Sequence, residues 1–306
     1  MIARIRTYGA LVAFSHTVFA MPFAATAVVL ALAEPHVPLT AARVLAMVLC
    51  MVTARTSAMA FNRWADRDVD AENPRTRSRH LPAGVIRPRE ALAVAIGSGL
   101  AFLVGAATLG FWPAVLAPGV LVVLLGYSFA KRFTWGAHAW LGVALALAPG
   151  GAWLAVGASP GLGIVALMVA VATWLLGFDV LYSLQDETFD RERGLHSIPA
   201  RFGTRGALII SSAAHVVTVA ALSVTGIALH RGIFFALAVV AVGALLVYEH
   251  ALVGFPRKTA RDAPDALERA TSSGVNLGKI DKAFFDVNAW VSVAFFALVA
   301  GDALTR

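Results

Sequence analysis

The sequence predicts an all-α integral membrane protein, and three observations lead to this fold class: composition, apolar runs and the placement of basic residues. Of the 306 residues, 59% are hydrophobic and only 14% are charged, whereas roughly a quarter of a soluble domain is charged. Nine apolar runs are long enough to cross a hydrocarbon core of about 30 Å. Barrel strands would alternate apolar and polar residues, so we expect nine transmembrane helices.

The apolar runs cover the chain almost from end to end. They comprise residues 8–33, 41–61, 91–111, 112–130, 137–157, 162–184, 207–229, 232–254 and 284–304. The first follows the basic segment MIARIR, but it is longer than the apolar region of a signal peptide, about 7–15 residues, so we expect a retained helix. No linker separates a second unit, and we expect residues 1–306 to form a single transmembrane domain.

Lysine and arginine gather in alternate connecting segments. If the N-terminus is cytoplasmic, cytoplasmic segments hold 21 of the 25 basic residues, and the exceptions are Arg43, Arg55, Arg231 and Arg306. The positive-inside rule therefore predicts a multi-pass protein of the inner (cytoplasmic) membrane with a cytoplasmic N-terminus. The net charge of +7 then belongs to a membrane face, and we expect the lipid bilayer, not nucleic acid, as a partner.

Cysteine and histidine give no sign of a metal or disulfide site. Cys50 is the single cysteine, and the eight histidines show no ligand spacing such as H-E-x-x-H. We therefore expect neither a disulfide framework nor a metal held by thiolate or imidazole.

Two acidic motifs end two apolar runs that both enter the cytoplasmic side. They are Asn62-x-x-x-Asp66-x-x-x-Asp70 and Asp179-x-x-Tyr182-x-x-x-Asp186-x-x-x-Asp190. Residues four apart share a helix face, so each motif predicts a row of side chains. Like charges at this spacing, and anions at a helix C-terminus, are unfavourable without compensation. Carboxylate and amide oxygens suit Mg²⁺, which we expect as the cofactor.

Basic residues near the motifs fit an anionic ligand. Mg²⁺ is usually held by a few carboxylates together with substrate phosphates, and arginine and lysine both bind phosphate. The candidates are Arg67, Arg75, Arg77, Arg79, Lys131, Arg132, Arg191, Arg193 and Arg201. A diphosphate on a lipid tail would explain both the metal motifs and the surrounding bilayer.

The two motifs closely resemble those of the UbiA superfamily of intramembrane aromatic prenyltransferases. The resemblance extends to the segments that follow them, NPRTRSRHLPAG and RERGLHSIPARFG, and to YSFAKRFT at 127–134. The string YSLQDETFDRERGLHSIP most resembles its 4-hydroxybenzoate polyprenyltransferase branch. The resemblance covers nearly the whole chain. It implies a UbiA-type helical bundle with a catalytic cavity on the cytoplasmic side. The implied activity is Mg²⁺-dependent transfer of a polyprenyl group from polyprenyl diphosphate to the ring of 4-hydroxybenzoate, a hydroxyarene carboxylate, in quinone biosynthesis.

The resemblance also implies roles for the motif residues. The set that would hold Mg²⁺ against the diphosphate is Asn62, Asp66, Asp70, Asp186 and Asp190. Arg55, seven residues before Asn62, would contact the carboxylate of the acceptor, although an ion pair with Asp179 is the alternative. Asp179 would orient the acceptor or take its proton.

Further substrate contacts follow from the same resemblance. Tyr127, Ser128 and Lys131 match positions near the diphosphate or the acceptor, with an ordinary interfacial anchor as the alternative. Arg79 is a candidate phosphate contact. Tyr182 would shield a cation with its π face or simply pack in the core.

Three other functions compete with this interpretation. Prenylation of a dihydroxynaphthoate in menaquinone biosynthesis would use the same motifs, and that acceptor also carries a carboxylate. A transporter could line an ion path with Arg55 and Asp179, but the acids cluster at one face instead of the midplane. A phosphatidyl-alcohol transferase would pack its aspartates into one motif, whereas this chain has two distant ones.

Overall fold

The protein folds as a bundle of long helices. The computed structural model describes residues 9, 11, 17–254 and 277–305, and every regular element within them is helical. The long helices are α2 (Thr17–Ala31), α3 (Ala41–Glu72), α4 (Pro88–Leu109), α5 (Phe111–Ala130), α6 (Ala137–Ala155), α7 (Leu162–Ser183), α9 (Ile198–Ala228), α10 (Ile233–Val253) and α13 (Asn288–Leu304). Short turns of helix join them: η2 (Leu184–Asp186), α8 (Glu187–Glu192), η3 (Leu277–Lys279), α12 (Ile280–Lys282) and η4 (Ala283–Val287).

The helices match the predicted membrane spans. Among the described residues, eight helices are long and apolar enough to cross a membrane. Helix α2 is the shorter ninth, with 15 described residues, and part of its predicted run 8–33 lies outside the described residues. The prediction of an all-helical, multi-pass membrane protein is therefore confirmed, and the count of nine is close.

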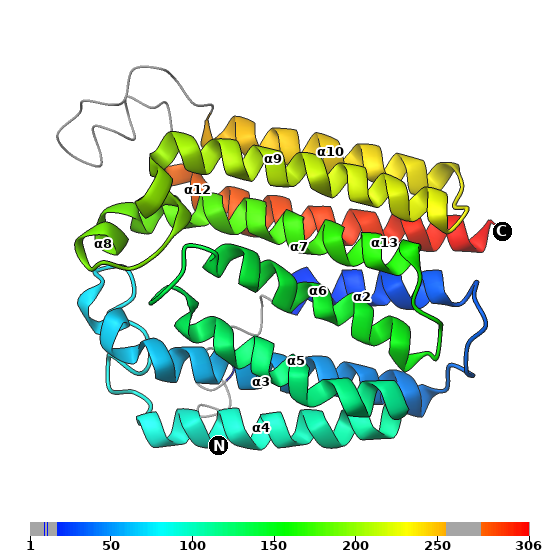
Figure 1. Ribbon diagram of the computed structural model, residues 1–306, viewed down its shortest axis with the longest axis horizontal. Coiled ribbons are helices and arrows are strands. Elements are labelled where there is room, and N and C mark those ends of the chain that lie inside the picture. The colour runs from blue at the N-terminus through cyan, green and yellow to red at the C-terminus, as the bar shows by residue number, and fades with distance from the viewer. Residues whose placement is uncertain (1–8, 10, 12–16, 255–276, 306) are drawn as a thin grey trace.

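The long helices lie side by side along one direction (Figure 1). Helix α7 packs against α9 and α6, α3 packs against α4, and α13 packs against α10 and α2. A small residue allows the closest approach of α6 and α7: a Cβ atom on Gly142 would lie 2.3 Å from the carbonyl oxygen of Ala172. This contact fits the close packing through small residues that is typical of membrane helices.

Helix starts follow local signals. The side chain of Thr40 caps α3 by accepting a hydrogen bond from the Arg43 backbone N–H, and Ser197 caps α9 in the same way through Ala200. Helix α9 begins before the predicted run 207–229, but Gly203 has φ of 70° and kinks it. The segment after this kink corresponds to the predicted span.

The two acidic motifs differ in their backbone conformation. Helix α3 continues without a break through Asn62, Asp66 and Asp70, as the four-residue spacing predicts. The second motif also lies on a helical stretch, Leu162–Glu192, but a tighter turn interrupts its α-helix, so its residues do not form one regular row. Helix α7 ends at Ser183, and the tighter turn η2 leads into α8. Figure 1 shows α8 beside the α3–α4 loop, at one end of the bundle.

Two basic residues outside the predicted cytoplasmic segments have structural partners. Arg43 donates hydrogen bonds to the carbonyl oxygens of Leu109 and Ala155, near the C-terminal ends of α4 and α6, where a cation is favourable. Arg231 forms a buried ion pair with Asp302, with 3.1 Å between Nε and Oδ2. These partners explain why both arginines occur at the less basic end of the bundle.

Replacement of Asp302 by alanine is expected to destabilise the protein. Its carboxylate also accepts the backbone N–H groups of Gly232 and Phe235 at the start of α10, so Asp302→Ala strands a buried Arg231 and removes a helix cap. We expect a loss of about 3–5 kcal/mol, measured as a lower thermal unfolding midpoint in detergent. Glu34→Ala, at an exposed position, is the control, and equal midpoints for both variants would contradict the prediction.

Candidate active site

One large cavity is lined by every motif residue and by every substrate contact that the family resemblance implies. Its volume is about 1110 Å³. The predicted residues that line it are Arg55, Asn62, Asp66, Asp70, Arg79, Tyr127, Ser128, Lys131, Asp179, Tyr182, Asp186 and Asp190. The fold therefore brings together two motifs that are more than a hundred residues apart in sequence.

The cavity has a polar end and a long apolar arm. The acidic motifs border the polar end, and side chains such as Val44, Met51, Trp112 and Leu116 line the arm. Along α3, lining residues extend from Val44 to Asp70, which at about 1.5 Å per residue is about 39 Å. The cavity thus follows the helices for more than the thickness of a membrane's hydrocarbon core, about 30 Å.

The acids of the first motif are held by hydrogen bonds and ion pairs. Asn62 donates to Asp66 at 2.8 Å, and Asp66 lies 3.7 Å from the guanidinium of Arg132. Asp70 pairs with Arg79 through Oδ1 at 2.7 Å. The other oxygen of Asp70, Oδ2, is buried and has no hydrogen-bond partner in the described part of the chain.

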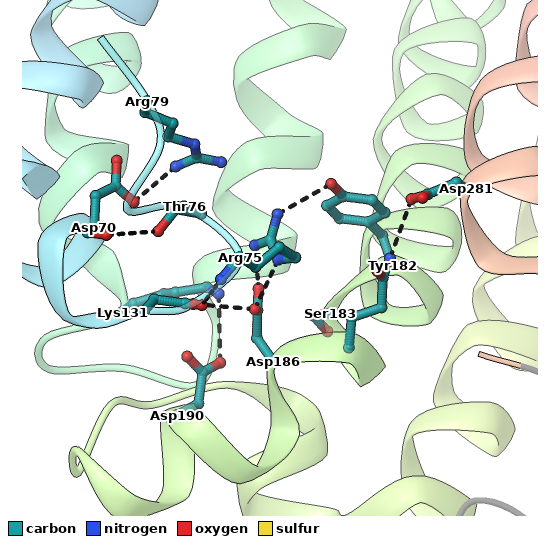
Figure 2. A network of polar contacts seen from close by, with 12 residues as sticks. Asp70, Arg75, Thr76, Arg79, Lys131, Tyr182, Ser183, Asp186, Asp190 and Asp281 are labelled. Atoms are coloured by element: carbon teal, nitrogen blue, oxygen red, sulfur yellow. Dashed lines mark hydrogen bonds and ion pairs between the residues drawn. The ribbon is translucent and has the colours of Figure 1, made fainter. Parts of the chain in front are cut away.

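The second motif is tied to the loop that follows the first. Arg75 donates to Asp186 through Nε at 2.9 Å and through its Nη2 group (Figure 2). Asn73 donates to the same carboxylate at 3.2 Å. The guanidinium of Arg75 also donates to the Tyr182 hydroxyl and lies 5.4 Å from the centre of that ring. Lys131 lies 3.4 Å from Asp190.

The four motif carboxylates are thus matched one to one with cations. The pairs are Asp66–Arg132, Asp70–Arg79, Asp186–Arg75 and Asp190–Lys131. Burial disfavours the charged form of Lys131, but Asp190, Asp186 and Asp179 outweigh it and raise the pKa of Lys131. Burial acts against Arg75 too, and its hydrogen bond to Asp186 raises its pKa. Both cations therefore stay charged at neutral pH.

Only some of the predicted phosphate-binding cations reach the cavity. Arg75, Arg79, Lys131 and Arg132 line it. The other five candidates, Arg67, Arg77, Arg191, Arg193 and Arg201, are not among its lining residues in the described part of the chain. Three of those five pair with acids elsewhere, namely with Asp68, Glu187 and Glu72, so these side chains belong to the polar surface and not to the cavity.

Two lining residues were missed from the sequence. His138 hydrogen-bonds through Nδ1 to Oδ2 of Asp179 at 2.6 Å, and its side chain is only 1% exposed. Arg63 lines the cavity without a hydrogen bond or ion pair to any described residue, within electrostatic reach of Asp66 and Asp70. Arg63 directly follows Asn62, but it does not fit the four-residue spacing of the motif, so the spacing did not identify it as a site residue. No sequence signal links His138 to Asp179, 41 residues away on another helix.

The donor atoms fit a metal that is held partly by its substrate. Within the described residues, no three histidine, cysteine or acidic side chains form a ready cage for an ion. The free Oδ2 of Asp70 and the Asn62–Asp66 pair supply hard oxygen ligands. Such a sparse set suits Mg²⁺, which usually binds one or two carboxylates and completes its shell with water and phosphate.

The ion pair between Arg75 and Asp186 is expected to contribute measurably to stability. A double-mutant cycle with Arg75→Gln and Asp186→Asn should give a coupling energy of about 1–3 kcal/mol, because the pair is two-pronged and its carboxylate is buried. Unfolding in detergent without added metal measures it. The exposed pair Arg67–Asp68 provides the control cycle, where about 0–1 kcal/mol is expected. Equal coupling in both cycles would argue against this prediction.

Comparison with known proteins agrees with this arrangement. Residues 20–265 match the UbiA prenyltransferase family. A 4-hydroxybenzoate octaprenyltransferase of Nitrosomonas eutropha is 31% identical over 210 residues, which cover 67% of this chain and 72% of that protein. The apo structure of a UbiA homologue from Aeropyrum pernix K1 has a TM-score of 0.79 at 30% identity, covering 94% of this chain and 98% of that one.

A more distant structure has the same fold. It is a UbiA homologue from Archaeoglobus fulgidus bound to GPP and Mg²⁺, with a TM-score of 0.66 at 19% identity over 96% of this chain and 99% of that one. The matched family spans both acidic motifs and the cavity that they border. The chain therefore belongs to the UbiA prenyltransferase family.

Proposed function

We propose that this protein transfers a polyprenyl group from a polyprenyl diphosphate to the ring of 4-hydroxybenzoate in quinone biosynthesis, with Mg²⁺ as cofactor. The observation that carries the proposal is the convergence of both acidic motifs and their cations at the end of one long apolar cavity. The name of the Nitrosomonas eutropha relative supports the acceptor. The GPP and Mg²⁺ bound by the Archaeoglobus fulgidus homologue support the donor and the metal.

We further propose that the protein lies in the inner membrane with its N-terminus in the cytoplasm. The bacterial relatives support this membrane, and the distribution of basic residues supports the orientation. Prenyl diphosphate would then enter from the cytoplasmic side, where the acidic motifs lie.

The donor would bind at the polar end of the cavity. Asn62, Asp66, Asp70, Asp186 and Asp190 would hold Mg²⁺, which when bound supplies charge stabilisation for the departing diphosphate. Cations now paired with these carboxylates, among them Arg75, Arg79 and Lys131, would turn to the phosphate oxygens. When the diphosphate and Mg²⁺ bind, the carboxylates would exchange their cation partners for the metal, and these cations would pair with the phosphates. No unpaired charge would then be buried.

The acceptor would bind deeper in the cavity. Arg55 borders it there and would contact the carboxylate of 4-hydroxybenzoate. Tyr127 and Ser128 also line the wall, and Ser128 Oγ is buried with no hydrogen-bond partner in the described chain. The ring carbon next to the hydroxyl attacks C1 of the prenyl chain as the diphosphate leaves with the bonding electron pair, and loss of the ring proton restores aromaticity.

Arg63 is an additional donor contact in this proposal. It is a cavity cation without an ion pair to any residue that the structure describes, and Arg79, Asp66 and Asp70 lie within its electrostatic reach. Two guanidinium groups that face one polar space are stabilised by an anion between them. A diphosphate at the level of Asp66 and Asp70 satisfies both.

Purified protein in detergent is expected to prenylate 4-hydroxybenzoate from geranyl or longer diphosphate only when Mg²⁺ is present. Asp66→Ala and Asp186→Ala should each lose at least about 10²-fold in rate, because each removes a motif oxygen near the leaving group. Product analysis with 4-hydroxybenzoate and a dihydroxynaphthoate measures activity and identifies the preferred ring. Preference for the naphthoate would redirect the proposal to menaquinone biosynthesis, and no Mg²⁺-dependent diphosphate binding would refute it.

Arg63→Gln is expected to weaken donor binding more than acceptor binding. The KM for geranyl diphosphate should rise about 10-fold or more, since charge-assisted hydrogen bonds are worth about 1.5–3 kcal/mol, while the KM for 4-hydroxybenzoate stays within about 2-fold. Steady-state kinetics with each substrate varied separately test this. Arg67→Gln on the same helix, at a residue paired with Asp68, is the matched control. An unchanged donor KM in Arg63→Gln would exclude the contact.

A further inference from the structure

The buried side chain of His138 contacts one carboxylate of the cavity, that of Asp179. Asp179, on α7, lines the cavity and keeps 15% of its side chain exposed, whereas His138, in the first turn of α6, is 1% exposed. The two side chains meet at 2.6 Å between Nδ1 and Oδ2. The carboxylate is therefore the more exposed member of the pair, and the imidazole contacts it from a buried position.

The pairing favours one tautomer of His138. An ionised carboxylate only accepts hydrogen bonds, so the Nδ1 atom of His138 donates to Oδ2 of Asp179. The Nε2 atom of His138 is buried and has no partner in the described chain. The tautomer with its hydrogen on Nδ1 avoids placing an unsatisfied N–H at that buried position.

The pairing also leaves one carboxylate oxygen available. The hydrogen bond from His138 reaches Oδ2 of Asp179, and no described side chain or backbone group donates a hydrogen bond to Oδ1. Asp179 lies within electrostatic reach of Tyr127 and Lys131, two other cavity residues. A carboxylate that borders a membrane cavity is costly unless it serves a ligand or a partner. Here Oδ2 has a partner, and Oδ1 has none in the described part of the chain.

We propose that His138 is a positioning residue that holds Asp179 as the base for the hydroxyl group of the aromatic acceptor. This inference rests on the proposed function. The hydroxyl O–H bond breaks and its proton passes to Oδ1 of Asp179, while the electron density released into the ring forms the bond to C1 of the prenyl chain. The C1–O bond breaks, and its electron pair leaves with the diphosphate. The ring proton then passes to water, and Asp179 returns its proton to the acceptor oxygen.

The substitutions His138→Phe and His138→Asn separate this role from packing. Phenylalanine keeps a ring of similar size but cannot donate, whereas the amide nitrogen of asparagine falls near the position of Nδ1. In His138→Phe we expect kcat with 4-hydroxybenzoate to fall about 10²-fold, the scale of general acid–base catalysis, with little change in the KM for geranyl diphosphate. His138→Asn should recover most of kcat. His36→Phe, in an exposed loop, is the matched control.

The acidity of the acceptor provides the decisive comparison. The hydroxyl of 3-fluoro-4-hydroxybenzoate is more acidic, so it depends less on a base. The ratio of wild-type to His138→Phe kcat should therefore be at least several-fold smaller with this acceptor than with 4-hydroxybenzoate. Loss of packing alone would lower both rates by the same factor. Equal factors, or no loss of kcat in His138→Phe, would overturn the proposal.

A binding measurement keeps this inference distinct from the proposed function. Bound 4-hydroxybenzoate should show the red-shifted absorbance of a phenolate-like hydroxyl in the wild-type protein, and this shift should be lost in His138→Phe but kept in His138→Asn. If the wild type binds the acceptor with this shift yet forms no product, the proposed transfer fails and the positioning role stands. An identical spectrum in wild type and His138→Phe overturns the role, whatever the activity.

Discussion

The pairing of four aspartates with four cations is the interaction on which the rest of the site depends. Asp66, Asp70, Asp186 and Asp190 border an otherwise apolar cavity inside a membrane bundle. Buried charges without partners are strongly destabilising, and removing one partner of such a pair exposes that cost. The carboxylates can stay close together because Arg132, Arg79, Arg75 and Lys131 neutralise them separately.

These pairs also shape the connecting segments. Arg75 and Arg79 belong to the α3–α4 loop, and Lys131 and Arg132 belong to the turn between α5 and α6. Within the α3–α4 loop, the Thr76 hydroxyl donates to the Asp70 carbonyl at 3.0 Å (Figure 2). Each loop is therefore folded over the cavity's polar end by contacts to the acids beneath it. The cations that stabilise the fold through these pairs are the ones that, under the proposed function, would contact the diphosphate.

The sequence was informative where one residue property decides the structure. A membrane span needs about 20 apolar residues, so composition located most helices to within a few residues, although α3 and α9 extend well beyond their predicted runs. The four-residue spacing on unbroken α3 placed Asn62, Asp66 and Asp70 correctly. It was less informative where the outcome depends on contacts between segments. The four-residue spacing gave no sign of the turn η2 that interrupts the α-helix in the second motif. The choice of which arginines face the cavity, and the partnership of His138 with Asp179, depend on how helices dock.

Polar side chains line the cavity at two depths: those of the acidic motifs at its polar end, and those of Arg55 and Asp179 deeper in it. This arrangement bears on how two substrates would share the cavity. Arg55 precedes Asn62 by seven residues on α3, so it lies about 10 Å along that helix from the first acidic motif. Asp179 precedes Asp186 by the same number, across the turn η2. That separation is close to the combined reach of a diphosphate and the first carbon of its chain. In the proposed reaction, a ring held by Arg55 and Asp179 would therefore meet C1 of the prenyl group, not the phosphates. The polyprenyl tail would occupy the apolar arm of the cavity. The reaction would take place between the acidic motifs and the deeper residues Arg55 and Asp179.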